Sequence, residues 1–512
     1  MRTMESKLAM AMLAAGAFAL AALGEGGSAP GPFKPEWESL QRYKCPEWFR
    51  DAKFGIWAHW GPQCVPMWGD WYAKNMYVPG ANRDQYKHHV ETYGHPSKFG
   101  YKDIIPLWKA EKFDPDRLMS LYKAAGARYF VSMGVHHDNF DLWNSRHHRW
   151  NAVQMGPGRD IVGAWQKAAQ KNGLKFGVSE HLGASFTWFQ TSHGSDKEGP
   201  MAGVPYDGAD PQWQDLYHPP AAPDDKAWYS TNPAWAKEWL CRITDLVDQY
   251  QPDLLYTDGA LPFGEVGRTM LANYYNSSQA RHGGNVQAVY CLKDPGKRTG
   301  HGDYVEGIGV QDIERGGLSG IKEQPWQTDT SIGDWFYNKN WKAKDTGTMY
   351  RAPGWVIRNL VDIVSKNGNM LLNIIQRPDG SLDPEVEQLL ADIAAWTKVN
   401  GEAIYATRPW EVYGEGETKV DSGHFKEDFA FSARDIRFTR SKDGQTLYAV
   451  ALGIPEGEVR IQSLAKGKKP VSSVQLLGSD ERISWKQEAD ALVIQKPAAW
   501  PCGHAVAFRI RD

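Results

Sequence analysis

The 512-residue sequence contains few cysteines and no common nucleotide-binding loop. Its five cysteines are an odd and widely spaced set, and no CxxC or Cys/His spacing typical of a zinc site occurs. A disulfide framework is therefore not expected, although Cys45 and Cys64 flank a predicted strand and could pair. No GxGxxG or GxxxxGK(S/T) segment is present, which removes the commonest nucleotide-binding folds.

The sequence also lacks a strong charge of either sign. Its formal net charge is −3, from 58 Lys and Arg against 61 Asp and Glu, and no basic run stands out. Nucleic acid and anionic lipid surfaces are therefore not expected as partners. A hydrophobic fraction of 42% with 23% charged residues is that of a globular protein.

The one candidate for a membrane span lies at the N-terminus. Arg2 and Lys7 come before an Ala/Leu-rich run over residues 8–23, and small residues follow it. This order is typical of a secretory signal peptide, to which we assign residues 1–29. The run is too short and too rich in alanine for a stable span, with an uncleaved anchor as the alternative. The protein is therefore expected to be secreted or periplasmic.

Aromatic residues are abundant, with 23 Trp and 22 Tyr. Sugars present flat C–H faces that stack on aromatic rings, so carbohydrate binding is one explanation for the excess. Packing in the core is the other explanation, and it applies to most of these side chains whatever the function.

Short apolar runs alternate with amphipathic segments from a Pro/Gly linker at residues 30–34 to about residue 410. Strands are expected over 54–58, 129–135, 174–178, 253–257, 288–291 and 369–374, and the short run 308–313 is a further candidate strand just before Glu314. Helices are expected over 115–125, 160–172, 233–250, 266–281, 355–365 and 384–399. The alternation predicts a parallel sheet with outer helices, and the number of units favours a (β/α)8-like TIM barrel over residues 30–410.

The last hundred residues differ in character from the rest. Segments at 446–452, 471–477 and 491–495 are rich in strand-forming residues and are separated by Gly, Asp and Lys turns. No long helical period occurs there. We therefore expect a small C-terminal antiparallel β-sandwich over residues 411–512.

Ionisable residues stand directly after four of the predicted strands. In chain order they are His59, the pair His136 and His137, the pair Glu180 and His181, and Asp258. Catalytic residues of a TIM barrel sit at these carboxyl ends. A single histidine at a strand end is more often structural, so it is the convergence of four strands that indicates an active site.

Two classes of enzyme fit such a ring. A metal-dependent amidohydrolase needs ligating His and Asp residues, but adjacent residues of one strand, such as His136 and His137, point to opposite faces. The first strand also lacks a His-x-His pair. A glycosidase needs two carboxylates flanking a sugar, together with aromatic and histidine side chains that hold it. The aromatic excess and the signal peptide favour the glycosidase.

Seven ordered segments between about residues 36 and 410 resemble the α-L-fucosidases of glycoside hydrolase family 29. They are WFRDAKFGIWAHWG (48–61), HHDNFDLWNS (136–145), GLKFGV (173–178), PDLLYTDG (252–259), WQTDTSI (326–332), VSKNGNMLLNI (364–374) and VNGEAIY (399–405). The resemblance implies a retaining exo-α-L-fucosidase acting on fucosylated oligosaccharides or polysaccharides, with no metal and no organic cofactor. Linkage and oligomeric state stay open.

The resemblance also implies binding residues for the sugar. His59, His136 and His137 match the histidines that bind fucose hydroxyls in the family, and Trp60 and Trp143 match aromatic residues of the fucose pocket. Packing within the barrel is the alternative role for both tryptophans.

The two catalytic carboxylates match the family unequally. Asp258 matches its nucleophile, in an Asp-Gly turn. Many members have Trp-Glu where this chain has Gln327, and an amide cannot cycle a proton as a carboxyl does. Glu314 is the preferred acid/base, with Glu323 and Glu180 as rivals. A carbohydrate-binding pseudoenzyme on the same fold is the alternative function.

Two further departures affect the substrate. Tyr256 stands where a Trp often precedes the nucleophile, and we count it among the substrate-binding residues. Lys293 stands in place of an Arg beyond the next strand. Both substitutions bear on the preference for the group that carries the fucose.

Overall fold

The computed structural model describes residues 30–81 and 83–511. The predicted signal peptide at 1–29 lies outside the described residues. Within the part that is described, no helix is both long and apolar enough to cross a membrane.

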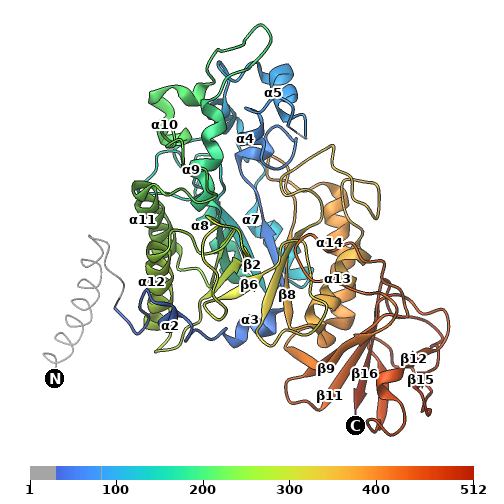
Figure 1. Ribbon diagram of the computed structural model, residues 1–512. Helices are drawn as coiled ribbons and strands as arrows, with labels where there is room; N and C mark the ends of the chain where they lie inside the picture. The colour runs from blue at the N-terminus through green and yellow to red at the C-terminus, as the bar shows by residue number, and fades with distance from the viewer. Residues whose placement is uncertain (1–29, 82, 512) are drawn as a thin grey trace, which may run out of the picture.

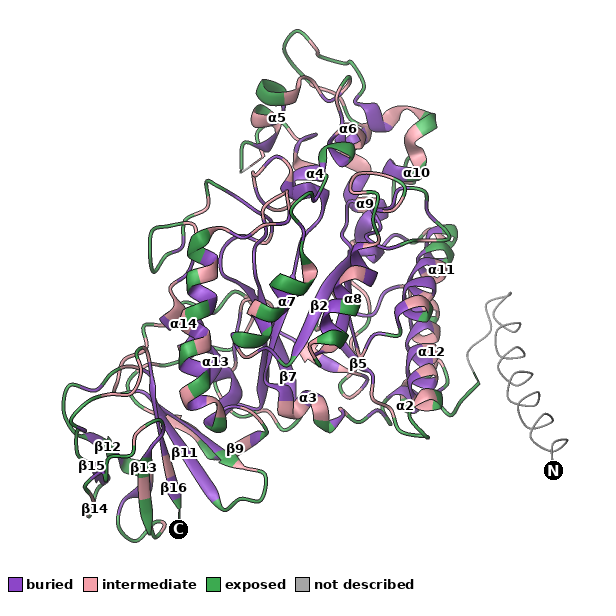
Figure 2. Cartoon of the chain, turned by 180° about the vertical axis from the view of Figure 1, so that it is seen from behind, coloured by how far each residue is buried: buried purple, intermediate pink, exposed green. Residues whose placement is uncertain are grey.

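Eight parallel strands close into a barrel in the order of the sequence, which confirms the predicted (β/α)8-like fold (Figure 1). The strands are β1 (Phe54–Ala58), β2 (Tyr129–Val135), β3 (Lys175–Glu180), β4 (Leu254–Thr257), β5 (Val289–Lys293), β6 (Val310–Asp312), β7 (Trp326–Ser331) and β8 (Gly368–Asn373). Nearly every strand residue is buried, because the strands have the filled barrel on one side and, except at β6, helices on the other (Figure 2).

Six helices form the outer layer, and their starts follow from local capping. They are α7 (Pro115–Ala124), α8 (Ile161–Lys171), α11 (Pro233–Tyr250), α12 (Glu265–Arg281), α13 (Pro353–Ser365) and α14 (Pro384–Asn400). The Asp114 and Asp160 carboxylates and the Asn232 side-chain oxygen each accept a backbone N–H of the first turn, satisfying an otherwise unpaired donor. The predicted helices agree with these bounds to within two residues.

Shorter helices decorate the two ends of the barrel. They are α2 (Trp37–Leu40), α3 (Glu47–Ala52), α4 (Tyr72–Asn75), α5 (Gln85–Tyr93), α6 (Tyr101–Ile104), α9 (Ser185–Trp188) and α10 (Gln214–Tyr217). Figure 1 shows α4, α5 and α10 at the top of the molecule, opposite α3. The long segments after β1 and β3 therefore build up one end of the barrel.

Strand β7 is not among the strands expected from the sequence. Its residues from Gln327 to Ser331 are all polar, although the whole strand is buried. The strand pairs with β8 along its whole length and with β6 at Trp326 and Gln327, so it is a regular member of the barrel. Sequence patterns predict buried strands from apolar residues. A buried strand with polar side chains, as occurs near a functional site, therefore escapes such a prediction.

The C-terminal residues form two antiparallel sheets, as expected. One has the order β13-β16-β11-β10-β9 and the other β12-β15-β14. Their strands are β9 (Thr407–Glu415), β10 (Ile436–Ser441), β11 (Thr446–Ala451), β12 (Val459–Ile461), β13 (Ser473–Leu476), β14 (Trp485–Gln487), β15 (Leu492–Ile494) and β16 (Val506–Arg511). Figure 1 shows them in orange and red beside α13. All five cysteines are free, so Cys45 and Cys64 do not pair.

Candidate active site

A cavity of about 620 Å³ opens at the carboxyl ends of the barrel strands. Asp258, Lys293 and Glu314 line it, and they come from the ends of β4, β5 and β6. This is the end at which TIM-barrel enzymes carry their active sites. The strand-end pattern of the sequence therefore converges on one hollow.

The turn after β4 fixes Asp258. Its backbone N–H donates to the carbonyl of Glu180 (3.0 Å) on the neighbouring strand. Gly259 follows with a φ of 136°, and a Cβ there would lie 2.2 Å from the Tyr229 hydroxyl. Only glycine fits this backbone, so the Asp-Gly pair holds the carboxylate at the cavity floor.

Three groups surround the Asp258 carboxylate. Oδ1 lies 2.5 Å from the Lys293 Nζ, while Oδ2 lies 3.1 Å from His181 Nδ1 and 3.3 Å from His137 Nε2. Burial alone would raise the pKa of Asp258, but the Lys293 charge and the contacts from both histidines hold it well below its usual range. The group is therefore an anion at neutral pH.

Glu314 lies two residues beyond β6 and shares Lys293 with Asp258. Its Oε2 is 2.8 Å from the same Nζ. The two carboxylate oxygens therefore cannot be farther apart than the sum of both contacts to Nζ. So short a separation of these two oxygens is consistent with the roughly 5–5.5 Å between the carboxyls of a retaining glycosidase pair.

The environment of Glu314 shifts its pKa in the opposite direction from that of Asp258. Burial raises the pKa of the Glu314 carboxyl; the Lys293 ammonium opposes the rise, while Asp329 and Asp258 add to it. The balance leaves the pKa above its usual range. Two neighbouring carboxyls with pKa values pushed apart are the usual sign of an acid and a nucleophile.

The two rival carboxylates lie elsewhere. Glu180 is fully buried, and its oxygens accept hydrogen bonds from Thr257 (2.7 Å) and from the backbone N–H of Leu182 (3.0 Å). Glu323 is exposed on the loop after β6 and does not line the cavity. Arg315 follows Glu314 in the sequence, and an ion pair between them would lower the pKa of Glu314. Arg315 contacts Glu427 at 3.1 Å instead.

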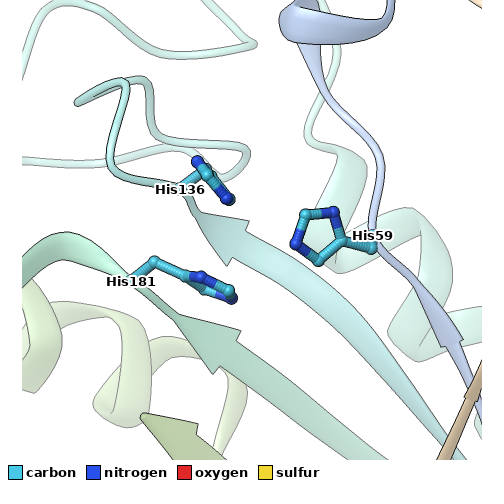
Figure 3. A group of neighbouring side chains, drawn as sticks. All are labelled: His59, His136 and His181. Atoms are coloured by element: carbon cyan, nitrogen blue, oxygen red, sulfur yellow. The ribbon is translucent and has the colours of Figure 1, made fainter. Parts of the chain in front are cut away.

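Three histidines from successive strands face one another at the cavity floor. Figure 3 shows His59, His136 and His181 beyond the ends of β1, β2 and β3. Burial lowers the pKa of all three, so the rings are neutral. The Gln63 amide oxygen accepts the N–H of Ala73, so its Nε2 donates to His136 Nδ1 (2.8 Å). The proton of His136 is then on Nε2, as a donor to a bound hydroxyl.

The same donors could hold a metal ion. His59, His136 and His181 form one group, and His137, His181 and Asp258 a second, with ligand atoms within 4.8 Å of one another in each. The expected opposite orientation of His136 and His137 is wrong, because both lie beyond the end of β2 and their rings are 4.6 Å apart.

The charges and protons favour the site without a metal. His136 carries its proton on Nε2, the nitrogen that is not bonded to Gln63, and the Lys293 ammonium already balances Asp258. The pKa of Lys293 is well above its usual range: burial opposes the rise, but Asp258 and Glu314 outweigh it. The absence of a metal requirement stays a prediction.

Four predicted substrate contacts do not line the cavity: Trp60, His137, Trp143 and Tyr256. His137 contacts the Asp258 carboxylate instead. Trp60 packs against Trp108 with ring centroids 4.8 Å apart, and Trp143 is fully buried with its N–H donating to Asp245 (3.0 Å). Both therefore have the packing role, and we do not propose them as sugar contacts. Tyr256 lies behind the carboxylates, where its hydroxyl donates to Asp329 (3.0 Å).

Several residues of the cavity were not predicted. They include Trp57, Trp71, Trp228, Trp335 and Asp329. Trp57 could have been found, because it is two positions before His59 and so shares its side of β1, whereas Trp60 is on the other side. The remaining tryptophans come from loops, for which the sequence has no comparable periodicity.

Comparison with known proteins shows the family of the chain. The sequence model described as Alpha-L-fucosidase matches residues 21–402, and the one described as Alpha-L-fucosidase C-terminal domain matches residues 430–511. The tissue alpha-L-fucosidase of Mus musculus is 29% identical over 494 residues, covering 94% of each chain. The plasma alpha-L-fucosidase of Homo sapiens is 28% identical, covering 91% of this chain and 88% of its own.

Solved structures give the same result. The alpha-fucosidase of Thermotoga maritima in complex with a mechanism-based inhibitor superposes with a TM-score of 0.72 at 27% identity, over 94% of this chain and 100% of the other. Its complex with fucose has a TM-score of 0.71 at 28% identity, over 93% and 99%. The sequence model, the relatives and the structures agree, and the chain belongs to the alpha-L-fucosidase family of glycoside hydrolases.

Proposed function

We propose that the protein is a retaining exo-α-L-fucosidase in which Asp258 is the nucleophile and Glu314 the acid/base. One observation carries the proposal: both carboxyls line one cavity, joined by Lys293, with their oxygens within the separation of a retaining pair. The opposite pKa shifts of Asp258 and Glu314 support the division of roles.

In the first step, Asp258 attacks the anomeric carbon of the bound fucosyl group. The bond to the leaving oxygen breaks as the Glu314 proton passes to that oxygen. The product of this step is a fucosyl ester on Asp258 with inverted configuration. His59, His136 and His181 hold the sugar hydroxyls from the cavity floor.

In the second step, Glu314 is ionised and takes a proton from water. The water attacks the same carbon, the ester bond breaks and Asp258 is released as the carboxylate. Two inversions give net retention, so the first product is α-L-fucose. The buried histidines that close the floor support removal of a terminal sugar rather than cleavage within a chain.

Azide rescue assigns each role separately. Asp258→Gly should lower activity on an aryl α-L-fucoside by on the order of 10⁴, and azide should restore turnover with β-L-fucosyl azide as product. Glu314→Ala should lose about 10²–10⁴-fold on fucosylated oligosaccharides. On an aryl α-L-fucoside, whose leaving group needs no acid, azide should restore turnover of this variant with α-L-fucosyl azide as product.

Glu323→Ala is the matched control and should behave like the wild-type protein. If Glu323→Ala or Glu180→Ala shows the rescue pattern instead of Glu314→Ala, the acid/base assignment is wrong. If the wild-type protein releases no fucose from any α-L-fucoside but binds one, the protein is the carbohydrate-binding pseudoenzyme.

We also propose export of the protein through its N-terminal segment. The charged start, the apolar run and the small residues up to Ala29 support a cleavable signal peptide. Mass spectrometry of the mature protein should find an N-terminus between about residues 24 and 31. An intact Met1 in protein from the cytosol would exclude export.

A further inference from the structure

The loop between β9 and β10, residues 416–435, starts in the C-terminal sheet but ends at the active-site cavity. His424 and Phe425 of this loop line the same cavity as Asp258 and Glu314. The reaction proposed above gives neither of them a role.

Backbone contacts join the loop to the proposed acid. The N–H of Glu314 donates to His424 Nδ1 (3.0 Å), and the N–H of Phe425 donates to the Glu314 carbonyl (2.9 Å). Gly423 pairs with Gly317 in an antiparallel bridge. A Cβ on Gly316 would lie 2.1 Å from the Gly423 carbonyl oxygen, so the two segments are in direct backbone contact.

Buried charge holds the other side of the loop. Glu427 is 8% exposed, and its carboxylate lies 3.1 Å from Arg315 and 3.2 Å from Arg351. Thr330 of β7 donates to the same carboxylate (2.5 Å). Charge-assisted contacts of this kind fix position as well as adding stability. The tip of the loop is therefore held on both sides of Phe425.

Phe425 is nevertheless largely exposed. Its exposed fraction is 65%, the largest among the exposed large apolar side chains of the described residues. Its φ is 58°, a left-handed conformation that is sterically unfavourable for a bulky residue. An exposed aromatic ring in a strained backbone at a cavity mouth indicates a binding contact more than a packing contact.

The neighbouring histidine adds a polar group of matching chemistry. Because His424 Nδ1 accepts the Glu314 N–H, and burial lowers the pKa of His424, the neutral ring carries its proton on Nε2. An aromatic face beside an N–H donor suits a sugar ring, which presents C–H groups on its face and hydroxyls at its edge. A hydrocarbon ligand would have no use for the donor.

We infer that Phe425 and His424 form the binding subsite for the sugar that carries the fucose, so that the C-terminal unit recognises the leaving group. The inference rests on the proposed function. Glu314 protonates the oxygen that joins the two sugars, and the next ring must lie beside it. The β9–β10 loop, which is hydrogen-bonded to the Glu314 backbone, lies beside the position of that ring.

Two substrates test the inference. Methyl α-L-fucoside and a fucosyl disaccharide both need the Glu314 proton, but only the disaccharide has a ring to stack on Phe425. Phe425→Ala should lower the ratio of kcat/KM for the disaccharide to kcat/KM for the methyl fucoside by about ten-fold. Phe425→Trp should keep or raise this ratio, because the aromatic face remains.

The controls separate stacking from effects on the acid. Leu107→Ala removes another exposed apolar side chain, outside the cavity, and should leave the ratio unchanged. If Phe425→Ala lowers both rates equally, or neither, the loop does not bind the leaving sugar and the inference is wrong. Failure of the wild-type protein to hydrolyse either substrate would instead refute the proposed function.

Discussion

Lys293 lies between the two carboxyls that the proposed reaction uses, 2.5 Å from Asp258 and 2.8 Å from Glu314. Its charge has unequal effects. It keeps Asp258 ionised, as a nucleophile must be, and it opposes the burial that keeps the proton on Glu314. The residue therefore sets both limits of the pH range in which the pair is active.

Replacing Lys293 should move the pH profile in a defined direction. In Lys293→Gln the pKa values of Asp258 and Glu314 should both rise, because a lowering charge is lost. Activity needs ionised Asp258 and protonated Glu314, so both limbs of the kcat/KM profile should shift to higher pH. Lys293→Arg keeps the charge and should keep the limbs in place. A shift to lower pH in Lys293→Gln would contradict this account of the pair.

The reaction should not require a metal ion. The histidines around Asp258 are close enough to hold an ion, but the His136 tautomer and the Lys293 charge argue against one. Prolonged treatment with a strong chelator should leave fucose release unchanged. Loss of activity that zinc or calcium restores would show that the donors do hold a required metal.

Residue roles could be predicted where strand alternation or a motif placed them, and not elsewhere. Asp258 and His59 follow apolar runs, and the structure brings them to one cavity. Trp60 stands in a motif of the family, but its ring packs on Trp108 outside the cavity. Phe425 gave no signal, since its place depends on contacts more than 100 residues away along the chain.

Among the elements, the connections around β6 differ most from a regular barrel. Residues 294–309 and 313–325, all described, contain no helix, so β6 lacks the helical cover that the other strands have. The β9–β10 loop contacts this segment instead. The sequence allowed β6 to be placed from an apolar run, but nothing in it indicated that cover from the C-terminal unit would replace a helix.

The contact between these two loops can be tested at a glycine. Gly316→Ala would force a Cβ against the backbone of Gly423, and we expect a loss of about 1–3 kcal/mol in the free energy of unfolding. Gly320→Ala is the matched control, because no atom lies within 4 Å of a Cβ there. Chemical denaturation of both variants measures the difference. Equal stability would mean that the loops are not in contact.

Over the whole molecule, buried charges join the barrel to the C-terminal unit. Arg437 of β10 contacts Asp362 of α13 (2.6 Å), and Lys366 contacts the same carboxylate (2.7 Å). All three side chains are almost completely buried. The fold class and the ends of most helices and strands could be predicted from sequence periodicity. The contact between the barrel and the C-terminal unit could not, because it depends on single polar residues that follow no periodic pattern.

Breaking that contact should destabilise both units together. Arg437→Met leaves Asp362 with one partner and should cost about 3 kcal/mol in the free energy of unfolding, in a single transition. Arg460→Met removes a mostly exposed group of ion pairs and should cost less than about 1 kcal/mol. Two separate transitions in the wild-type protein would show that the units unfold independently.

The configuration of the first product distinguishes a retaining reaction from an inverting one. Proton NMR should follow the hydrolysis of an aryl α-L-fucoside on a timescale faster than mutarotation. A retaining pair formed by Asp258 and Glu314 predicts α-L-fucose as the first product, with the β anomer appearing later. Initial formation of β-L-fucose would contradict the covalent mechanism and the role of Asp258 in it.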